Sequence, residues 1–384
     1  SVTPADDGAM AVLRDVLGAL GFRVWELPFG DPPTPNLFAR LGEDAPHLGF
    51  AGHTDVVPPG DPAAWRVDPF AGELVDGVVY GRGACDMKGG ITAFVAAVAA
   101  RIDRDGGWRG GSVSLLVTGD EEGPATDGTV RVLDWMAANG QLPEFCVVGE
   151  PSNPSRIGEM IKVGRRGTLN ARLLVRGVQG HVAYPERADN PVHRLLAALH
   201  ALVQRPLDDL VQRPSDDLVQ RPLDDGSPAF QPSGLQVTSI DVGNPASNVI
   251  PAVAEARFNI RFNDRHDGTS LSAHLRGVCE QHAPGCELEI AVGGEPFLCP
   301  GSPGLDALRD AVRTVTGLEP ALDTGGGTSD ARFIAQHCPV AEFGLVGASM
   351  HKVDENVPVS ELRTLAAVYG VLLDRMLPPG AEAR

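Results

Sequence analysis

The segment HLGFAGHTD, residues 47–55, begins with an apolar run that reaches a glycine and then continues into polar residues. An apolar run of this length bounded by turn residues predicts a buried strand followed by a loop. The same pattern recurs in SVSLLVT (112–118), FCVV (145–148) and VAEFGLV (340–346), and GITAFVAAVAARI (90–102) predicts an apolar helix between the first two strands. Strands that alternate with helices indicate a layered α/β domain.

The stretch from 167 to 293 follows a different order. It predicts strands at 168–178, 235–242, 256–263 and 287–292, with helices at 190–203 and 269–282. The resulting order β-α-β-β-α-β is the ferredoxin-like pattern. The sequence therefore predicts an α/β domain made of residues 1–166 and 294–384, split by an inserted ferredoxin-like (βαββαβ) domain of residues 167–293.

An internal repeat lies inside the inserted domain. Residues 202–225 consist of three tandem octapeptides, LVQRPLDD, LVQRPSDD and LVQRPLDD. A period of eight with a proline in each unit suits neither a long helix nor a solenoid. The repeat is either a binding arm or a duplication accommodated in a surface loop, and we favour the loop because long surface insertions cost little closure entropy.

Composition limits the possible partners and the compartment. The chain of 384 residues has 32 Lys+Arg against 50 Asp+Glu, a net charge of −18, which disfavours binding to nucleic acid. Apolar runs recur, but none approaches the roughly 20 residues of a membrane span. The six cysteines form no C-x-x-C pair, as is typical of thiols in a reducing cytosol. The chain opens on Ser-Val-Thr-Pro without a signal pattern, so we expect a cytoplasmic protein.

Polar residues with metal-binding side chains follow the predicted core strands. The first strand leads into His53 and Asp55, and Asp86 opens the apolar helix; the later strands lead into Glu121, Glu122, Glu150 and His351. Open α/β sheets bind ligands at the carboxyl ends of their strands, so these side chains should converge. Any one of them alone would be an ordinary loop residue or helix cap.

The negative charge of several carboxylates that converge on one place must be offset by positive charge. Carboxylates packed together raise each other's pKa, and a divalent metal removes that problem. Histidine and carboxylate ligands suit zinc, and two metal ions about 3.5–4 Å apart can share one bridging carboxylate. Five ligands then suffice for two ions, and Asp55 is the natural partner for the His53 imidazole.

Five strings carry a family resemblance: GHTDVVPPGD (52–61), YGRGACDMKGG (80–90), TGDEEGPATDGT (118–129), VGEPS (148–152) and MHKVDENVP (350–358). Together they resemble the M20 family of co-catalytic zinc amidohydrolases and peptidases. The strings VGRRGTLN (163–170), VQGHVAYPERADNP (178–191), SNVIPA (247–252) and TGGGTSDARFIA (324–335) extend the resemblance over nearly the whole chain. It implies a zinc-peptidase-like catalytic domain with an inserted lid and dimerisation domain.

The resemblance also implies roles for the convergent residues. Asp86 would bridge two zinc ions, with cobalt or manganese an alternative in the second site. His53 and Glu150 would complete the first site, and Glu122 and His351 the second. Glu121 would be the general acid/base acting on the water that the two ions share.

Within the family, the strings DEEGPA, GRRG and GHVAYP favour hydrolysis of N-succinyl-LL-2,6-diaminopimelate to succinate and LL-2,6-diaminopimelate, in bacterial lysine biosynthesis. Deacetylation of acetylornithine, or a broader action on N-acyl amino acids, is the alternative within the same class. A non-catalytic, metal-dependent binding protein is the alternative of another class. In either enzyme the substrate would be a small anion.

Further residues occupy substrate-binding positions of the family: Arg165, Thr168, Tyr184, Asn248, Arg261, Gly327 and Thr328. Arginine pairs with carboxylates through two parallel hydrogen bonds, which suits an anionic substrate. The resemblance implies that His181 reaches the active site of the neighbouring subunit, which would make a homodimer through the lid necessary for catalysis. Cys85 departs from the family, which usually has Ala or Ser there; it is a stray zinc ligand, an oxidation-sensitive thiol or a small buried side chain.

Overall fold

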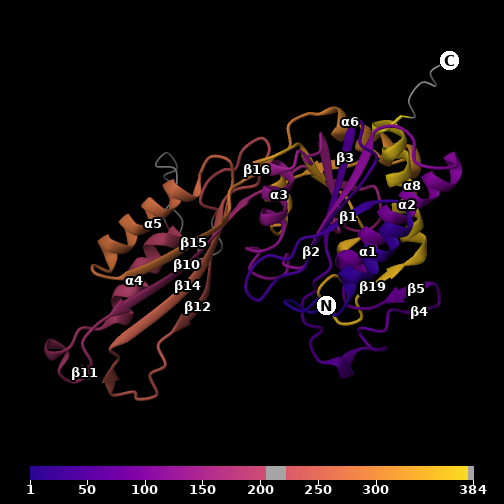
Figure 1. Ribbon diagram of the computed structural model, residues 1–384. Helices are drawn as coiled ribbons and strands as arrows, with labels where there is room; N and C mark the ends of the chain where they lie inside the picture. Colours follow the sequence, from indigo (N-terminus) through magenta and orange to yellow (C-terminus); the bar gives the residue numbers. More distant parts are fainter. Residues whose placement is uncertain (205–221, 379–384) are drawn as a thin grey trace. The chain divides into compact units, whose positions relative to one another are not determined.

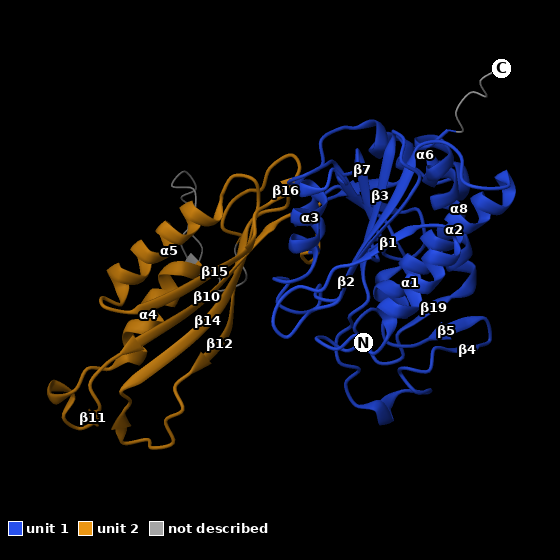
Figure 2. Ribbon diagram, viewed as in Figure 1, with its two compact units in different colours: residues 1–164, 298–323, 329–384 blue, residues 165–297, 324–328 orange. Residues whose placement is uncertain are grey.

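The computed structural model describes residues 1–204 and 222–378. The chain divides into two compact units (Figure 2): unit 1 comprises residues 1–164, 298–323 and 329–384, and unit 2 comprises residues 165–297 and 324–328. The boundaries predicted at 166/167 and 293/294 therefore fall at 164/165 and 297/298.

The segment 324–328 departs from the predicted boundaries, because it belongs to unit 2 rather than to unit 1. Two long-range hydrogen bonds account for this. The Thr324 hydroxyl donates to the Ala229 carbonyl at 2.6 Å, and the Gly325 carbonyl accepts from Nη1 of Arg165 at 2.7 Å. Neither bond can be read from the spacing of residues along the chain.

An eight-stranded mixed sheet forms the centre of unit 1. Its order is β1 (Arg23–Glu26), β2 (Asn36–Leu41), β6 (Ser112–Thr118), β3 (His47–His53), β7 (Phe145–Val148), β18 (Val340–Glu342), β8 (Met160–Lys162) and β17 (Ala321–Asp323). The run β6-β3-β7-β18 is parallel. Every residue of β3, β6 and β7 is buried, as expected of strands covered on both faces.

Strand β18 is shorter than the predicted strand at 340–346. Phe343 and Leu345 stay buried, but the chain leaves the ladder after Glu342. At Gly344 the backbone passes so close to Glu150 that a Cβ would lie 2.4 Å from the Glu150 carbonyl oxygen. The close approach explains both the glycine and the early end of the strand.

Helices cover both faces of this sheet (Figure 1). Helices α2 (Gly89–Asp105), α6 (Pro303–Thr316) and α8 (Val359–Met376) cover one face, with α1 (Ala9–Ala19) beside α2, while α3 (Thr129–Ala138) and α7 (Ala331–Ile334) cover the other. The ring of Phe94 on α2 stacks on Phe50 of β3 with centroids 4.3 Å apart. A separate three-stranded sheet joins β19 (Asn356–Pro358), β5 (Val78–Tyr80) and β4 (Glu73–Val75).

Unit 2 has the predicted ferredoxin-like order. Its elements are β10 (Gly167–Arg176), α4 (Pro191–Gln204), β12 (Gly234–Asp241), β14 (Val253–Phe262), α5 (Gly268–His282) and β15 (Glu287–Gly294). The antiparallel sheet has the order β12-β14-β10-β15, with both helices on one face (Figure 1). A short hairpin pairs β11 (Gly180–His181) with β13 (Val249–Ile250). The α/β fold with an inserted ferredoxin-like domain is thus confirmed.

The octapeptide repeat is tied to unit 2 at both ends. Helix α4 ends at Gln204, the third residue of the first octapeptide, and residues 205–221 lie outside the described part. In the third octapeptide, Leu223 is 3% exposed in the core of unit 2. The buried Asp224 carboxylate accepts hydrogen bonds from Gly226 N at 2.7 Å, Ser233 N at 3.1 Å and Asn263 Nδ2 at 2.7 Å. The described end of the last octapeptide, residues 222–225, is therefore anchored, whereas the choice between arm and loop concerns residues that are not described.

Among the described residues, no helix is both long enough and apolar enough to cross a bilayer.

Candidate metal centre

The carboxyl ends of the parallel strands deliver the predicted ligands to one edge of the sheet. His53 is the last residue of β3, Glu121 and Glu122 follow β6, and Glu150 follows β7. Gly149 allows this arrangement, because a Cβ there would lie 2.4 Å from Cζ of Phe50 and 2.8 Å from Cε of Met87. Only a glycine lets the chain turn against the core at this point and present Glu150.

Asp86 lies between two histidines and offers one oxygen to each. Its Oδ1 is 3.3 Å from Nε2 of His53, and its Oδ2 is 3.1 Å from Nε2 of His351. The same His53 nitrogen is 3.6 Å from Oε1 of Glu150, and the same His351 nitrogen is 2.9 Å from Oε1 of Glu122. The five predicted ligands therefore gather as two sets that share the Asp86 carboxylate.

The charge balance of this cluster calls for a cation. Burial, aided by the nearby Asp86 carboxylate, raises the pKa of Glu150 well above its usual range. Hydrogen bonds to Asp86 and Glu122 raise the pKa of His351 to about 10. Burial opposes protonation of His53, but the adjacent carboxylates of Asp55 and Asp86 outweigh it and raise the pKa. These raised pKa values reflect an excess of negative charge that a divalent ion would offset.

Ligand atoms also lie close enough together for metal binding. Those of His53, Asp86 and Glu122 lie within 4.8 Å of one another, as do those of His53, Glu121 and Glu150. One nitrogen-bearing and several oxygen-bearing ligands around a small space are a donor set that suits zinc. The residues present fit a dinuclear metal centre.

Glu121 lies in this cluster within ligand distance of His53 and Glu150, but its expected role is that of a proton carrier rather than a ligand. Burial raises its pKa to about 8, and the negative charges of Asp330 and Glu122 add to the rise, while His53 opposes it. A carboxyl group with a pKa near neutrality can both accept and donate a proton under physiological conditions. The pKa is therefore consistent with the general acid/base role expected for this residue.

Asp55 lies beside the His53 imidazole and has two further partners in the loop after β6. Nδ1 of His53 is 2.8 Å from the Asp55 backbone carbonyl and 3.6 Å from its carboxylate, so the carbonyl is the closer acceptor. The carboxylate accepts the backbone N–H of Glu121 on Oδ1 at 3.2 Å and that of Glu122 on Oδ2 at 2.9 Å. Asp55 thus supports the loop that carries Glu121 as well as the imidazole.

Of the three alternatives for Cys85, the structure favours a small buried side chain over a zinc ligand or an oxidation-sensitive thiol. Its side chain is 1% exposed, and Sγ donates to the Val346 carbonyl at 3.1 Å. Burial raises the pKa of the thiol, which disfavours the thiolate that a metal ligand or an oxidation site needs. The geometry supports the small buried side chain. All six cysteines lie in the described part, and each is a free thiol.

Four buried carboxylates near this edge were not selected from the sequence: Asp120, Asp330, Glu342 and Glu355. Glu342 accepts from the Ser329 hydroxyl at 2.5 Å, inside an otherwise apolar strand. A charged residue within the run VAEFGLV was the available signal for Glu342. Asp330 and Glu355 lie inside strings that carry the family resemblance, yet their spacing gives no indication of what they contact.

Unit 2 contains all the predicted substrate residues and His181. One group lies at the start of β10: Arg165 is 8% exposed, Thr168 is 6% exposed, and Thr168 is paired in register with Arg261 of β14. The segment carrying Gly327 and Thr328 joins this group, since the Arg165 guanidinium bonds to Gly325 and lies directly beside Gly326. A buried arginine next to exposed glycine backbone is a suitable environment for a carboxylate ligand.

The remaining group lies beyond the other end of β10. His181 and Tyr184 have ring centroids 5.8 Å apart, and the Asn248 carbonyl accepts the N–H of Val182 at 3.1 Å. All three of these predicted residues are exposed. The ten residues of β10 separate the two groups by about 30 Å at the usual rise of a strand. Within one chain, unit 2 therefore does not bring His181 to the Arg165 group.

Comparison with known proteins assigns the chain to a family. The model of peptidase family M20/M25/M40 matches residues 49–375. A succinyl-diaminopimelate desuccinylase of Gluconacetobacter diazotrophicus is 61% identical over 379 residues, covering 98% of this chain and 94% of the relative. The enzyme of the same name from Granulibacter bethesdensis is 59% identical, with 97% and 94% covered.

Solved structures share the fold at lower identity. An M20 family metallo-carboxypeptidase from Sulfolobus solfataricus superposes with a TM-score of 0.78 at 18% identity, covering 97% of this chain and 94% of that one. A dinuclear metal-binding M20 peptidase from Bacillus subtilis gives 0.68 at 16% identity, covering 98% and 93%. Together with the family match over most of its length and the full-length relatives, this shows that the chain belongs to peptidase family M20/M25/M40.

Proposed function

We propose that this protein hydrolyses N-succinyl-LL-2,6-diaminopimelate to succinate and LL-2,6-diaminopimelate. The geometric observation that carries the hydrolase assignment is the Asp86 carboxylate, whose two oxygens face His53 and His351 separately. The substrate assignment is supported by relatives with 51–61% identity that bear the name succinyl-diaminopimelate desuccinylase. These names favour a succinylated substrate over acetylornithine, and comparing turnover of succinylated and acetylated substrates tests the choice.

The residues divide the work of amide hydrolysis. His53, Glu150 and Asp86 would hold one zinc ion, and Asp86, Glu122 and His351 the other, with cobalt or manganese possible in the second site. When bound, the metal pair would acidify a water molecule and polarise the amide carbonyl. Glu121 accepts the proton of the attacking water and passes it to the amine nitrogen as the amide bond breaks. Asp55 holds the backbone of Glu121 in place during both transfers.

Two adjacent substitutions test these roles against each other. Glu121→Gln keeps the ligands and removes the proton acceptor, so we expect wild-type zinc content and turnover lowered by about 10²–10⁴-fold. Glu122→Gln at the next position removes a ligand instead, and we expect it to lose metal from one site. Zinc content and steady-state rates measured on both variants decide the matter: turnover of Glu121→Gln within tenfold of wild type would contradict its role. A metal-dependent binding protein without catalysis would show no wild-type turnover at all.

We propose further that the anionic substrate pairs with Arg165 and Arg261, and that His181 acts in the active site of a second subunit of a cytoplasmic homodimer. The separation of His181 from Arg165 along β10 supports action across subunits. Co-refolding Glu121→Gln with His181→Ala tests this: mixed dimers contain one site with both residues intact only if His181 acts in trans. Restored turnover supports the arrangement, and its absence in mixed dimers contradicts it.

A further inference from the structure

Glu355 is a fully buried carboxylate with a complete set of donors. Its exposed fraction is 0%, and its Oε2 accepts from Nη1 of Arg82 at 2.5 Å and from Gly83 N at 3.2 Å. Its Oε1 accepts from the backbone N–H of Cys85 at 2.8 Å and of Asp86 at 3.0 Å. A buried carboxylate is costly unless it is paired and hydrogen-bonded, and here both oxygens are satisfied by one short segment.

The segment bound by Glu355 is the turn that ends in the bridging ligand. Arg82, its charged partner, is itself buried, lies 5.3 Å over the ring of Trp65 and donates to the Pro58 carbonyl at 3.4 Å. Because the amide of Asp86 donates directly to Glu355, the position of the Asp86 backbone depends on this carboxylate. A change in Glu355 would therefore reach the metal centre through one residue.

Glu355 is also tied to the other end of the site. It follows His351 by four residues in the loop that precedes β19. The Ser349 hydroxyl closes this loop, donating to the Asn356 carbonyl at 2.8 Å and accepting from Asn356 N at 3.2 Å. The Glu355 carbonyl accepts Gly81 N at 2.9 Å, continuing the pairing of β19 with β5. One residue thus links the loop of His351 to the turn of Asp86.

We propose that Glu355 is a positioning residue that sets the spacing between Asp86 and His351, and with it the affinity of the metal centre. The inference rests on the proposed metal-dependent function. Groups that orient metal ligands in proteins typically change metal affinity by 10–100-fold when they are replaced. Glu355 differs from such groups in acting through backbone amides rather than through a ligand side chain.

Glu355→Gln is the decisive variant. In either orientation its amide NH₂ faces two donors, Arg82 with Gly83 or Cys85 with Asp86, so one side of the turn must shift. We expect the apparent Kd for zinc, measured by chelator competition, to rise 10–100-fold. We also expect the visible spectrum of the cobalt-loaded protein to change. Neither readout needs a substrate: if both shift while the wild type lacks desuccinylase activity, the proposed function fails and the positioning role stands.

Two controls separate positioning from stability. Asp354→Asn changes the neighbouring carboxylate, which bonds to Arg66 instead. Leu308→Ala opens a cavity at a fully buried position of α6 and destabilises the fold without touching the site. Both should keep wild-type zinc affinity at a temperature where the protein is folded.

Wild-type zinc affinity and cobalt spectrum in folded Glu355→Gln would overturn the proposal. Should that variant fail to fold, Glu355→Asp replaces it, since the shorter carboxylate cannot reach both Arg82 and the Asp86 amide. Weakened zinc binding in folded Glu355→Asp supports the proposal, and unchanged binding overturns it.

Discussion

Asp55→Asn tests whether the loop that carries the proposed acid/base is held by a single carboxylate. Asp55 is 1% exposed, and its two oxygens each accept one backbone amide, of Glu121 at 3.2 Å and Glu122 at 2.9 Å. Asparagine keeps one acceptor and turns an NH₂ toward the other amide. A hydrogen bond to a charged group contributes about 1.5–3 kcal/mol, and little solvent is present to screen this one.

The same free energy sets the expected kinetic effect. A tenfold change in rate corresponds to about 1.4 kcal/mol. If the whole free energy of the lost hydrogen bond is missing from the transition state, kcat/KM falls by about 10–150-fold. Hydrolysis of the succinylated substrate, zinc content and urea unfolding should be measured on the same preparations. With zinc content unchanged, a kcat/KM within about threefold of wild type would refute the reasoning, since that corresponds to far less than one such bond.

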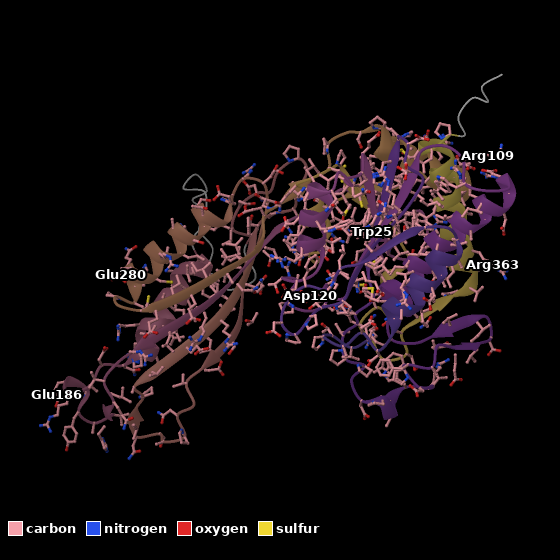
Figure 3. All side chains as sticks on the ribbon, in the orientation of Figure 1. Trp25, Arg109, Asp120, Glu186, Glu280 and Arg363 are labelled. Atoms are coloured by element: carbon pink, nitrogen blue, oxygen red, sulfur yellow. The ribbon has the colours of Figure 1, made fainter. Side chains whose placement is uncertain are left out.

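Asp120→Asn is the matched control. Asp120, labelled in Figure 3, also accepts two backbone amides of this loop, Thr126 N at 2.8 Å and Asp127 N at 3.0 Å. Both reach the same oxygen, Oδ2, so an asparagine can retain both bonds. We expect a smaller loss of stability than for Asp55→Asn and a smaller effect on turnover.

Three further outcomes are expected. Burial lowers the pKa of His47 to about 4, below the pKa of about 6.5 that this side chain has in the unfolded chain. About 3 kcal/mol of folding stability is therefore present above pH 6.5 and should be lost as the pH falls toward 4. Urea unfolding measured at several pH values should show this pH dependence in the wild type and a smaller one in His47→Gln. Leu223→Ala should lower the unfolding free energy by about 2–5 kcal/mol, and an unchanged urea midpoint would contradict the core position of Leu223. Zinc binding near neutral pH should release protons, because His351 has a pKa of about 10 without metal and must lose its proton to bind the ion. Calorimetric binding enthalpies that are equal in buffers of different ionisation enthalpy would exclude proton release.

The sequence predicts the fold and the ligand set because both depend on local patterns. Apolar runs fix the buried strands β3, β6 and β7, and parallel strands necessarily share an edge at their carboxyl ends. The sequence alone therefore predicts that His53 and Glu150 lie close together. The βαββαβ order of unit 2 follows from the same kind of pattern.

Contacts between distant segments account for what the sequence did not predict. Glu355 reaches back 270 residues to Cys85, and no spacing rule indicates which loop a carboxylate in a polar string will meet. The assignment of 324–328 to unit 2 depends on the bonds of Thr324 and Gly325, which are equally remote. That Asp55 accepts a hydrogen bond from Glu121 can be predicted only when the register of β3 against β6 is known. That Asp55 lies next to His53 follows from their spacing in the sequence.

The anchored octapeptide has a consequence for the history of this chain. Tandem copies in a gene are lost or gained as whole units. Each unit here carries LVQ, the sequence that ends α4 in the first copy, whereas only the first and third units carry LDD, the sequence whose Leu223 and Asp224 are buried in the third copy. Losing either of the first two copies leaves both attachments in place. Losing the third copy makes LVQRPSDD the last one and puts Ser215 where the core requires leucine. The buried position of Leu223 therefore restricts the final copy at a residue where the middle copy, with Ser215, would not supply the apolar side chain.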